Sequence, residues 1–326
     1  MRVPVMIAGL ASLSVLLTAA TAAAQQPIAY PVRPVRYIIP FPPGGSTDPM
    51  GRMIATRLTE RLGQTVVVDN RPGGNTVIGT ELLARAAPDG YTIGWCGASF
   101  FSTPSLMKLP YDSIKDFTGV TGIARQRSVL VLHPSVPAGN LQEFITLVKS
   151  KPGEFNFGSS GVGTNTHLSG ELFNQVAGTK MVHIPYKGSG PVTNDLLAGR
   201  LQLSFQVPIT VIPFITSGRL KPIAVTGDTR LAALPQVSTF KEAGLPNFGL
   251  TSVTLIAAPA RTPRPILNKI ATEVAAVLAM PVTQEFMVKQ GSEPLVATPE
   301  QSDAIIRDEI ARYAKIIKDA GIKYLP

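Results

Sequence analysis

The stretch VRYIIPFPPGGSTD, residues 35–48, decides the fold of this chain. Its first half is rich in β-branched, aromatic and aliphatic residues, which predicts a buried strand, and the prolines and glycines that follow end the strand in a tight turn. Apolar residues then recur at helical spacing from Met50 to Leu58, until Gly63 closes the predicted helix. A strand that leads straight into a helix is the repeating unit of α/β folds.

Short apolar strands and helical segments alternate along the rest of the chain, which favours an α/β fold around largely parallel sheets. Further strands are predicted over residues 65–68, 91–95, 129–133, 155–157, 181–186, 201–207, 222–225 and 253–259, and a last helix over residues 299–320. The 326 residues are too many for one average domain of roughly 100 to 200 residues and suit two. We therefore expect two lobes.

The N-terminus has the features of a secretory signal peptide. Arg2 precedes an apolar run over residues 3–17, and small residues follow as far as Ala24. The run is shorter than the roughly 20 residues that a membrane-spanning helix needs. We therefore predict cleavage after Ala24 and a periplasmic protein. The lone cysteine, Cys96, excludes an intramolecular disulfide and is expected to be a small buried apolar residue.

Composition and spacing argue against several classes of function. The formal net charge is +9, but the basic residues are scattered among acids and aromatic residues make up only 6% of the chain, so a nucleic-acid partner is not expected. The histidines His133, His167 and His183 lack the spacing of a zinc site. No segment matches a phosphate-binding loop or a nucleophile elbow. We expect neither a metal nor a cofactor.

Three glycine-rich loops join a predicted strand to a predicted helix: PPGGSTD, NRPGGNT and GSSGVGTNTH. Ligands of open α/β sheets bind where strands end and helices begin. In the first loop Gly44 and Gly45 admit a close backbone approach, and Ser46 or Thr47 caps the helix. Free N–H groups and the positive end of a helix suit a carboxylate or a phosphate. Each loop taken alone is better explained as a simple helix cap than as a binding site.

Longer segments extend this pattern over nearly the whole chain: VRYIIPFPPGGSTD, VVVDNRPGG, APDGYTIG, LPYDSIKDFTGV, FNFGSSGVGTNTHLSGELF, HIPYKGSGP and EAGLP. With these segments in this order, the chain resembles the Bug family, the substrate-binding receptors of tripartite tricarboxylate transporters. The resemblance implies a periplasmic binding protein fold of type II, in which two α/β lobes are joined by crossing strands around a ligand cleft. It places lobe one in residues 25–124 plus 252–326 and lobe two in residues 125–251.

The resemblance also implies which residues contact the ligand. In lobe one they are Phe41, Pro43, Gly44, Gly45, Ser46, Thr47, Asp48 and Ser99, and in lobe two Ser159, Ser160, Gly161, Thr164, His167, Tyr186 and Gln206. Asp48 is expected to hold the loop, because its charge repels an anion. Gln206 stands where many family members have aspartate, so a ligand with an ammonium group is less expected. Val253 stands where a tryptophan is common in the family.

On this interpretation the protein captures a small organic acid, a di- or tricarboxylate or an aromatic acid, by lobe closure. The closed form, a monomer, then docks on a membrane permease. No bond is made or broken, so we predict no catalytic residue and no enzyme activity. Two alternatives stay open. A sensory receptor for a membrane kinase has the same sequence features, and a secreted hydrolase would use Ser160 with His167.

Overall fold

The computed structural model describes residues 29–45 and 47–322. The predicted signal peptide with its cleavage site after Ala24, and the predicted contact Ser46, lie outside the described residues. The chain divides into two units, Met1–Tyr30 and Pro31–Pro326, and every described helix and strand belongs to the second unit.

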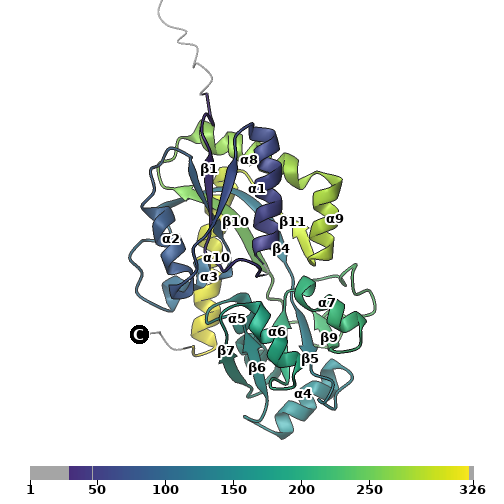
Figure 1. Ribbon diagram of the computed structural model, residues 1–326. Coiled ribbons are helices and arrows are strands. Elements are labelled where there is room, and N and C mark those ends of the chain that lie inside the picture. Colours follow the sequence, from purple (N-terminus) through teal and green to yellow (C-terminus); the bar gives the residue numbers. More distant parts are fainter. Residues whose placement is uncertain (1–28, 46, 323–326) are drawn as a thin grey trace, which may run out of the picture. The chain divides into compact units, whose positions relative to one another are not determined.

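Two β-sheets form the framework of the second unit (Figure 1). The first sheet has the order β11-β4-β10-β3-β1-β2 and consists of β1 (Val35–Ile39), β2 (Val66–Asn70), β3 (Thr92–Cys96), β4 (Phe117–Gln126), β10 (Ser252–Pro259) and β11 (Ser292–Pro294). The second sheet has the order β7-β6-β8-β5-β9 and consists of β5 (Val129–Leu132), β6 (Asn156–Ser159), β7 (Val182–Pro185), β8 (Leu203–Gln206) and β9 (Lys221–Val225).

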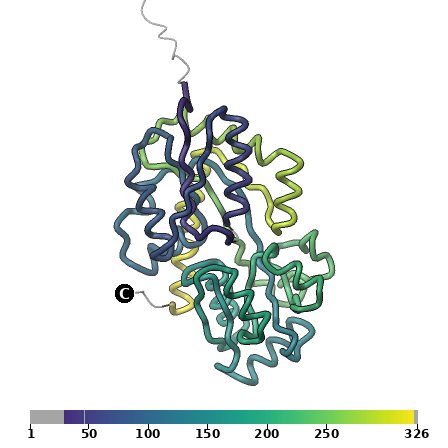
Figure 2. Tube along the Cα trace, in the orientation of Figure 1, coloured from purple at the N-terminus to yellow at the C-terminus, as the bar shows by residue number. Residues whose placement is uncertain are grey.

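Five strands of the first sheet have the same arrangement as the five strands of the second. In each sheet, one strand that follows a crossing of the chain between the sheets runs antiparallel to its neighbours. β1 pairs in parallel with β2 and β3, as β6 does with β7 and β8. β10 and β5 run antiparallel to both of their neighbours. The chain crosses to the second sheet at residues 127–128 and returns through residues 226–251 (Figure 2). Both sheets are therefore mixed, and the expectation of largely parallel sheets was wrong, because an alternating pattern does not reveal a strand that returns from the other sheet.

Helices connect the strands and pack on the sheets (Figure 1). They are α1 (Asp48–Leu62), α2 (Val77–Ala84), α3 (Ala98–Ser102), α4 (Leu141–Ser150), α5 (Asn165–Ala177), α6 (Ser189–Leu197), α7 (Pro208–Thr216), α8 (Arg264–Leu278), α9 (Pro281–Lys289) and α10 (Pro299–Asp319), with short 3-10 helices at Gly74–Thr76 and Thr103–Ser105. As predicted, α1 ends at Gly63, whose φ of 67° is a left-handed conformation that glycine adopts without strain. The strand β4 was not predicted, because glycines interrupt its apolar pattern.

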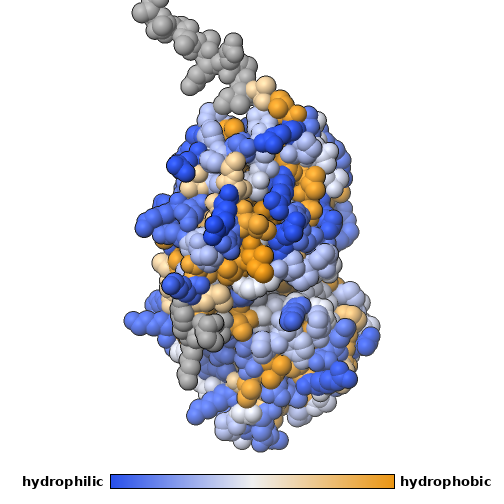
Figure 3. Space-filling model, turned by 60° about the vertical axis from the view of Figure 1, so that its left-hand side comes forward, coloured by the Kyte–Doolittle hydropathy of each residue, from blue (hydrophilic) through white to orange (hydrophobic). Residues whose placement is uncertain are grey.

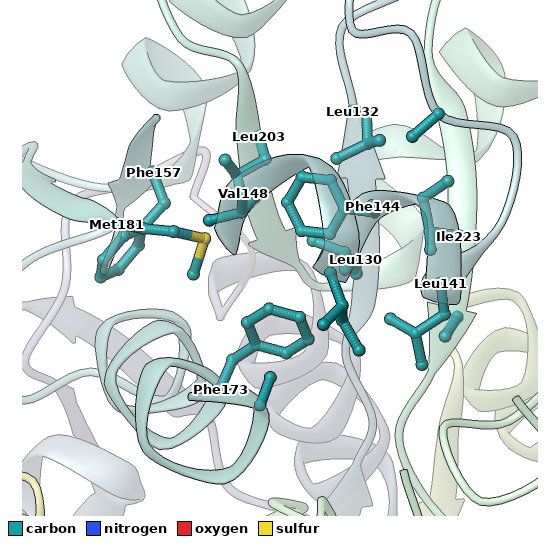
Figure 4. Close-up of a cluster of buried hydrophobic side chains, with 14 of the residues drawn as sticks. Leu130, Leu132, Leu141, Phe144, Val148, Phe157, Phe173, Met181, Leu203 and Ile223 are labelled. Atoms are coloured by element: carbon teal, nitrogen blue, oxygen red, sulfur yellow. The ribbon is translucent and has the colours of Figure 1, made fainter. Parts of the chain in front are cut away.

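Each sheet has its own hydrophobic core. In the second core, side chains from β5, β6, β8, α4 and α5 interlock around the fully buried Phe144 and Phe173 (Figure 4). Leu168 of α5 joins the first core instead, where Phe101 and Cys96 also lie. The burial of Cys96 confirms its prediction from the sequence. α5 therefore contributes side chains to both cores in this structure.

The face drawn in Figure 3 shows apolar residues among hydrophilic ones. On α2, for example, Ile78 and Leu82 are 50% and 37% exposed. Among the described residues, no single helix is long and apolar enough to cross a membrane, and α8 with α9 passes on length and composition only as a pair bent by 74°. α8 buries its apolar side, including Ile270 and Val274, inside the protein.

Candidate functional site

The ends of five strands meet at one pocket. β1 and β3 of the first sheet, and β6, β7 and β8 of the second, each lead to a helix whose N-cap residue lines this pocket. The N-cap residues are Thr47, Gly97, Thr164, Gly188 and Val207. The pocket has a volume of about 210 Å³. Helix starts carry free N–H groups and a positive partial charge, so their convergence favours an anionic ligand.

Asp48 stabilises the loop between β1 and α1 through hydrogen bonds of its carboxylate. Its Oδ2 accepts hydrogen bonds from the Gly44 N–H at 3.1 Å and from Arg52 Nε at 2.9 Å. Its Oδ1 accepts from Asn70 Nδ2 at 3.1 Å. Burial raises the pKa of Asp48, but the hydrogen bonds, that from Arg52 first, outweigh burial and hold the pKa below its usual value. The carboxylate therefore stays charged and holds the loop.

The loop between β6 and α5 is braced by neutral groups. The Ser160 N–H donates to Thr166 Oγ1 at 3.0 Å. The Gly163 N–H donates to Nδ1 of His167 at 3.0 Å, and the Gly163 carbonyl accepts from Ser102 Oγ of α3 at 2.7 Å. These loop amides are thus satisfied within the protein. The N–H groups that stay free for a ligand are those of Asn165 and Thr166, which line the pocket, since the His167 N–H donates to Thr164 Oγ1.

Behind this loop the fold brings together three residues that the sequence spacing does not connect: His167, Glu171 and His183, whose candidate ligand atoms lie within 4.8 Å of one another. The bond from Gly163 occupies Nδ1 of His167, so the neutral ring carries its proton on Nε2, 3.6 Å from Glu171. A metal needs the Nε2 lone pair that this tautomer lacks. Burial is the main cause that lowers the pKa of His183 to about 3. The cluster therefore fits a neutral brace for the loop better than a metal site.

Several polar side chains in the pocket wall have no hydrogen-bond partner among the described residues, although each residue is more than nine-tenths buried. They are the hydroxyls of Ser99, Ser189 and Thr254 and the indole N–H of Trp95. Among the described lining residues, Lys187 is the one with an ionisable side chain. The pocket therefore offers hydrogen-bond donors and a positive charge without an opposing carboxylate, which suits an anion.

The pocket lining includes predicted contacts that follow strands of both sheets: Phe41, Pro43, Gly44, Gly45, Thr47, Ser99, Ser160 and Thr164. It does not include Asp48, Ser159, Gly161, His167, Tyr186 or Gln206. The Tyr186 hydroxyl donates instead to Asp195 at 2.7 Å. The Gln206 amide donates to Ser204 Oγ at 3.0 Å and is almost completely buried. Both side chains are thus engaged within the protein.

Sequence reasoning missed lining residues of two kinds. Some lie in strands, in the loop after β1 or at helix starts: Pro42, Trp95, Gly97, Ala98, Gln126, Asn165, Thr166, Val207, Ser252 and Thr254. The others, residues 187–191, belong to the turn KGSGP at the start of α6. That turn had a usable signal, because it is a glycine-rich loop after a predicted strand. The strand residues had none, since the direction of a strand side chain depends on register.

The serine and histidine of the hydrolase alternative do not pair. Ser160 Oγ lies 3.0 Å from Thr166 Oγ1. Nδ1 of His167 accepts from the Gly163 amide. Ser159 Oγ does lie 2.6 Å from Nε2 of His183, but Ser159 is completely buried and outside the pocket lining. A nucleophile must reach its substrate, so this pair does not support hydrolysis.

Known proteins match this chain over most of its length. The family described as tripartite tricarboxylate transporter family receptor matches residues 50–322. The chain belongs to this receptor family. Protein BugT of Bordetella pertussis is 37% identical over 309 residues, which are 94% of this chain and 95% of BugT. The resemblance to the Bug family is thereby confirmed.

Solved structures of receptors in this family agree with the fold. R. palustris Rpa4515 with adipate has a TM-score of 0.86 and 35% identity, covering 91% of this chain and 100% of that chain. The periplasmic binding protein BugD has a TM-score of 0.83 and 34% identity, with the same coverage. The predicted fold class, two α/β lobes of the type II periplasmic binding protein, is confirmed. The relatives are substrate-binding receptors and not enzymes.

Proposed function

We propose that this protein is a periplasmic receptor that captures a small organic carboxylate by closing two lobes around it and delivers it to the permease of a tripartite tricarboxylate transporter. The signal peptide, residues 1–24, is removed on export. Lobe one consists of residues 25–124 plus 252–326 and lobe two of residues 125–251. The first sheet falls within lobe one, except for the last two residues of β4, and the second sheet falls within lobe two. The protein binds and releases its ligand unchanged, as a monomer.

The observation that carries this proposal is the convergence of five helix starts on a pocket that has no carboxylate in its described lining. N–H dipoles that the fold already orients stabilise an anion without further reorganisation. Lys187 adds a positive charge beside the start of α6, where a cation is unfavourable unless an anion is bound nearby. A volume of about 210 Å³ limits the ligand to a small molecule.

Closure follows from where the lining residues lie. The pocket takes Thr47 and Ser99 from the first sheet's side and Thr164 and Ser189 from the second sheet's side. A ligand contacts both sets together only in the closed form, so binding shifts the population toward that form. The two crossings of the chain, at residues 127–128 and 226–251, provide the hinge. The adipate bound by the R. palustris relative supports an organic acid as the ligand.

The test is a thermal-shift and calorimetric screen of mono-, di- and tricarboxylates, aromatic acids and amino acids. The full sequence is expressed, and the protein is purified from the periplasm, unfolded and refolded to remove any retained ligand. We expect mass spectrometry to show that residues 1–24 are missing. One acid class raises the melting temperature, with about 2.7 kcal/mol of added stability at a hundredfold excess over Kd. If no acid shifts the protein, the carboxylate assignment fails.

A serine pair gives a matched control. Ser99 and Ser113 are both buried, and neither side-chain hydroxyl has a partner among the described residues, but only Ser99 lines the pocket. Ser99→Ala removes one ligand hydrogen bond and weakens binding about fivefold to tenfold, whereas Ser113→Ala leaves Kd unchanged. Equal effects of the two substitutions would show that the acid binds elsewhere.

A further inference from the structure

Trp95 is the single tryptophan of the chain, and it stands in the wall of the pocket. It lies near the end of β3, paired with Ile256 of the neighbouring strand β10. The residue is 4% exposed, and its indole N–H has no hydrogen-bond partner among the described residues. An indole N–H only donates, so a partner for it must bring an acceptor into the pocket. This N–H therefore lacks an acceptor that a ligand in the pocket is placed to supply.

Thr254 of β10 presents a second donor at the same place. It is 1% exposed, lines the pocket, and its hydroxyl makes no hydrogen bond to another described residue. Ile256 pairs with Trp95, and Thr254 stands two residues before Ile256, so its side chain points to the same face of the sheet. A Cβ atom at Gly97 would lie 3.3 Å from Trp95 Nε1 and 3.9 Å from Thr254 Oγ1. The missing side chain at this glycine thus leaves open the space that both donors flank.

We propose that Trp95 and Thr254 form a subsite for a second oxygen atom of the ligand, apart from the carboxylate held by the helix starts. The inference rests on the proposed function and narrows its ligand class to acids with a further acceptor oxygen, in a second carboxylate, a hydroxyl or a carbonyl. An ammonium group gains nothing from the indole, which has no acceptor, and only the Thr254 hydroxyl remains to accept from it.

The subsite determines specificity because a ligand that leaves it empty binds more weakly. A pocket with buried donors discriminates strongly against an analogue that lacks the matching acceptor, because the donors then lose water without gaining a partner. Trp95 and Thr254 both come from strands of the first sheet, and the register between β3 and β10 holds them in place. Their positions are therefore set before the ligand arrives, and ordering them costs little on binding.

Pairs of acids that differ by one carboxylate test the subsite: adipate with hexanoate, succinate with butyrate, and phthalate with benzoate. We expect the dicarboxylate of at least one pair to bind more than about tenfold tighter than its partner by calorimetry. Its addition also changes the emission of Trp95, which is the sole tryptophan signal of the protein. If neither these acids nor any other acid of the screen binds, the proposed function falls and the subsite falls with it. If both members of every pair that binds do so equally, the subsite alone is overturned.

Replacement of the indole N–H tests the donor itself. Because the chain has one tryptophan, incorporation of β-(benzothiophen-3-yl)alanine exchanges a single N–H for sulfur and keeps the ring shape. We expect the dicarboxylate to lose about fivefold to twentyfold in affinity and the monocarboxylate to keep its Kd within about twofold. An unchanged ratio between the two acids overturns the role of Trp95. Trp95→Phe, which also removes the donor, provides a second reading of the same ratio.

Gly97→Ala tests the space between the donors. The φ of Gly97 is −148°, an extended conformation that alanine adopts freely, so the added methyl group acts by occupying the subsite. We expect more than about tenfold weaker binding of the dicarboxylate with a nearly unchanged melting temperature. Gly249→Ala is the matched control, since a Cβ there meets nothing within 4 Å and Gly249 lies outside the lining. If Gly97→Ala binds the dicarboxylate with the same Kd as Gly249→Ala, the proposal is contradicted.

Discussion

The glycine loops after β1 and after β6 begin their helices in different ways. The first is held by charge, with Asp48 accepting from the Gly44 N–H and from Arg52, and a Cβ at Gly44 would meet nothing within 4 Å. The second is held by neutral groups, and a Cβ at Gly163 would lie 2.6 Å from Leu106 of the first core. The first loop therefore has free space beside Gly44, whereas the second loop packs at Gly163 against residues on the first sheet's side.

Alanine at these two glycines separates backbone strain from packing. Gly44 and Gly163 share a φ of 74°, so alanine carries the same left-handed strain of about 1–2 kcal/mol at both. At Gly163 the methyl group also collides with Leu106 and Ser102, which adds about 1–3 kcal/mol. We expect Gly163→Ala to lower the free energy of unfolding by about 2–5 kcal/mol, and Gly44→Ala by about 1–2 kcal/mol. Denaturant unfolding of both variants measures the difference.

Binding of the acid found in the screen sharpens the same comparison. Gly163→Ala pushes the second loop away from α3 and breaks the contact between the sheets, so we expect it to weaken binding more than Gly44→Ala does. Equal losses of stability in the two variants would mean that the second loop shifts at little cost and that its packing against Leu106 contributes little to stability.

The groups that hold the two loops are expected to lose their contribution to stability in different ranges of pH. The pKa of Asp48 is below its usual value of about 3.9, so the stability it contributes is complete above that value and is lost as the pH falls through its folded pKa. The pKa of His183 is lowered to about 3, chiefly by burial, from an ordinary value of about 6.5. The unfolded chain then takes up a proton near pH 6.5 that the folded protein refuses, so stability falls from about pH 6.5 down to about pH 3.

Urea unfolding from pH 8 to pH 3 tests these ranges. In His183→Gln the decline between about pH 6.5 and pH 4 becomes shallower, because the titrating ring is gone and the amide still bonds to Ser159. In Asp48→Asn the free energy of unfolding still declines between about pH 6.5 and pH 4. The difference in this free energy between Asp48→Asn and the wild type becomes smaller below about pH 4. A decline that is the same in the wild type and in His183→Gln would mean that another group titrates.

The sequence predicted the fold well where one element specified its own ends. The run from Val35 and the closing Gly63 fixed β1 and α1, and the glycine loops pointed to helix starts that do line the pocket. Gly44, Thr47 and Thr164 belong to this group. Their position at a strand end is a local property, which spacing along the chain reveals.

What the sequence did not reveal depends on contacts between distant segments. Trp95 and Thr254 line the pocket because β3 and β10 are neighbours in one register, and a shift of one residue would turn both away. His167 of α5 and His183 of β7 stack with ring centroids 3.9 Å apart because α5 packs against β7. Such pairs are set by the topology, and a single sequence without its fold does not bring them together.

Tyr186 is the predicted contact whose removal we expect to matter least. It precedes the lining residues Lys187 and Gly188, but its hydroxyl donates to Asp195 at 2.7 Å and its ring packs toward the core that contains Val192. Tyr186→Phe keeps that packing and removes a hydrogen bond that is partly exposed, so Kd stays within about twofold and stability falls by about 1 kcal/mol or less. Calorimetry beside Ser99→Ala measures this. A loss of binding in Tyr186→Phe as large as that in Ser99→Ala would mean that closure turns the hydroxyl of Tyr186 from Asp195 to the ligand.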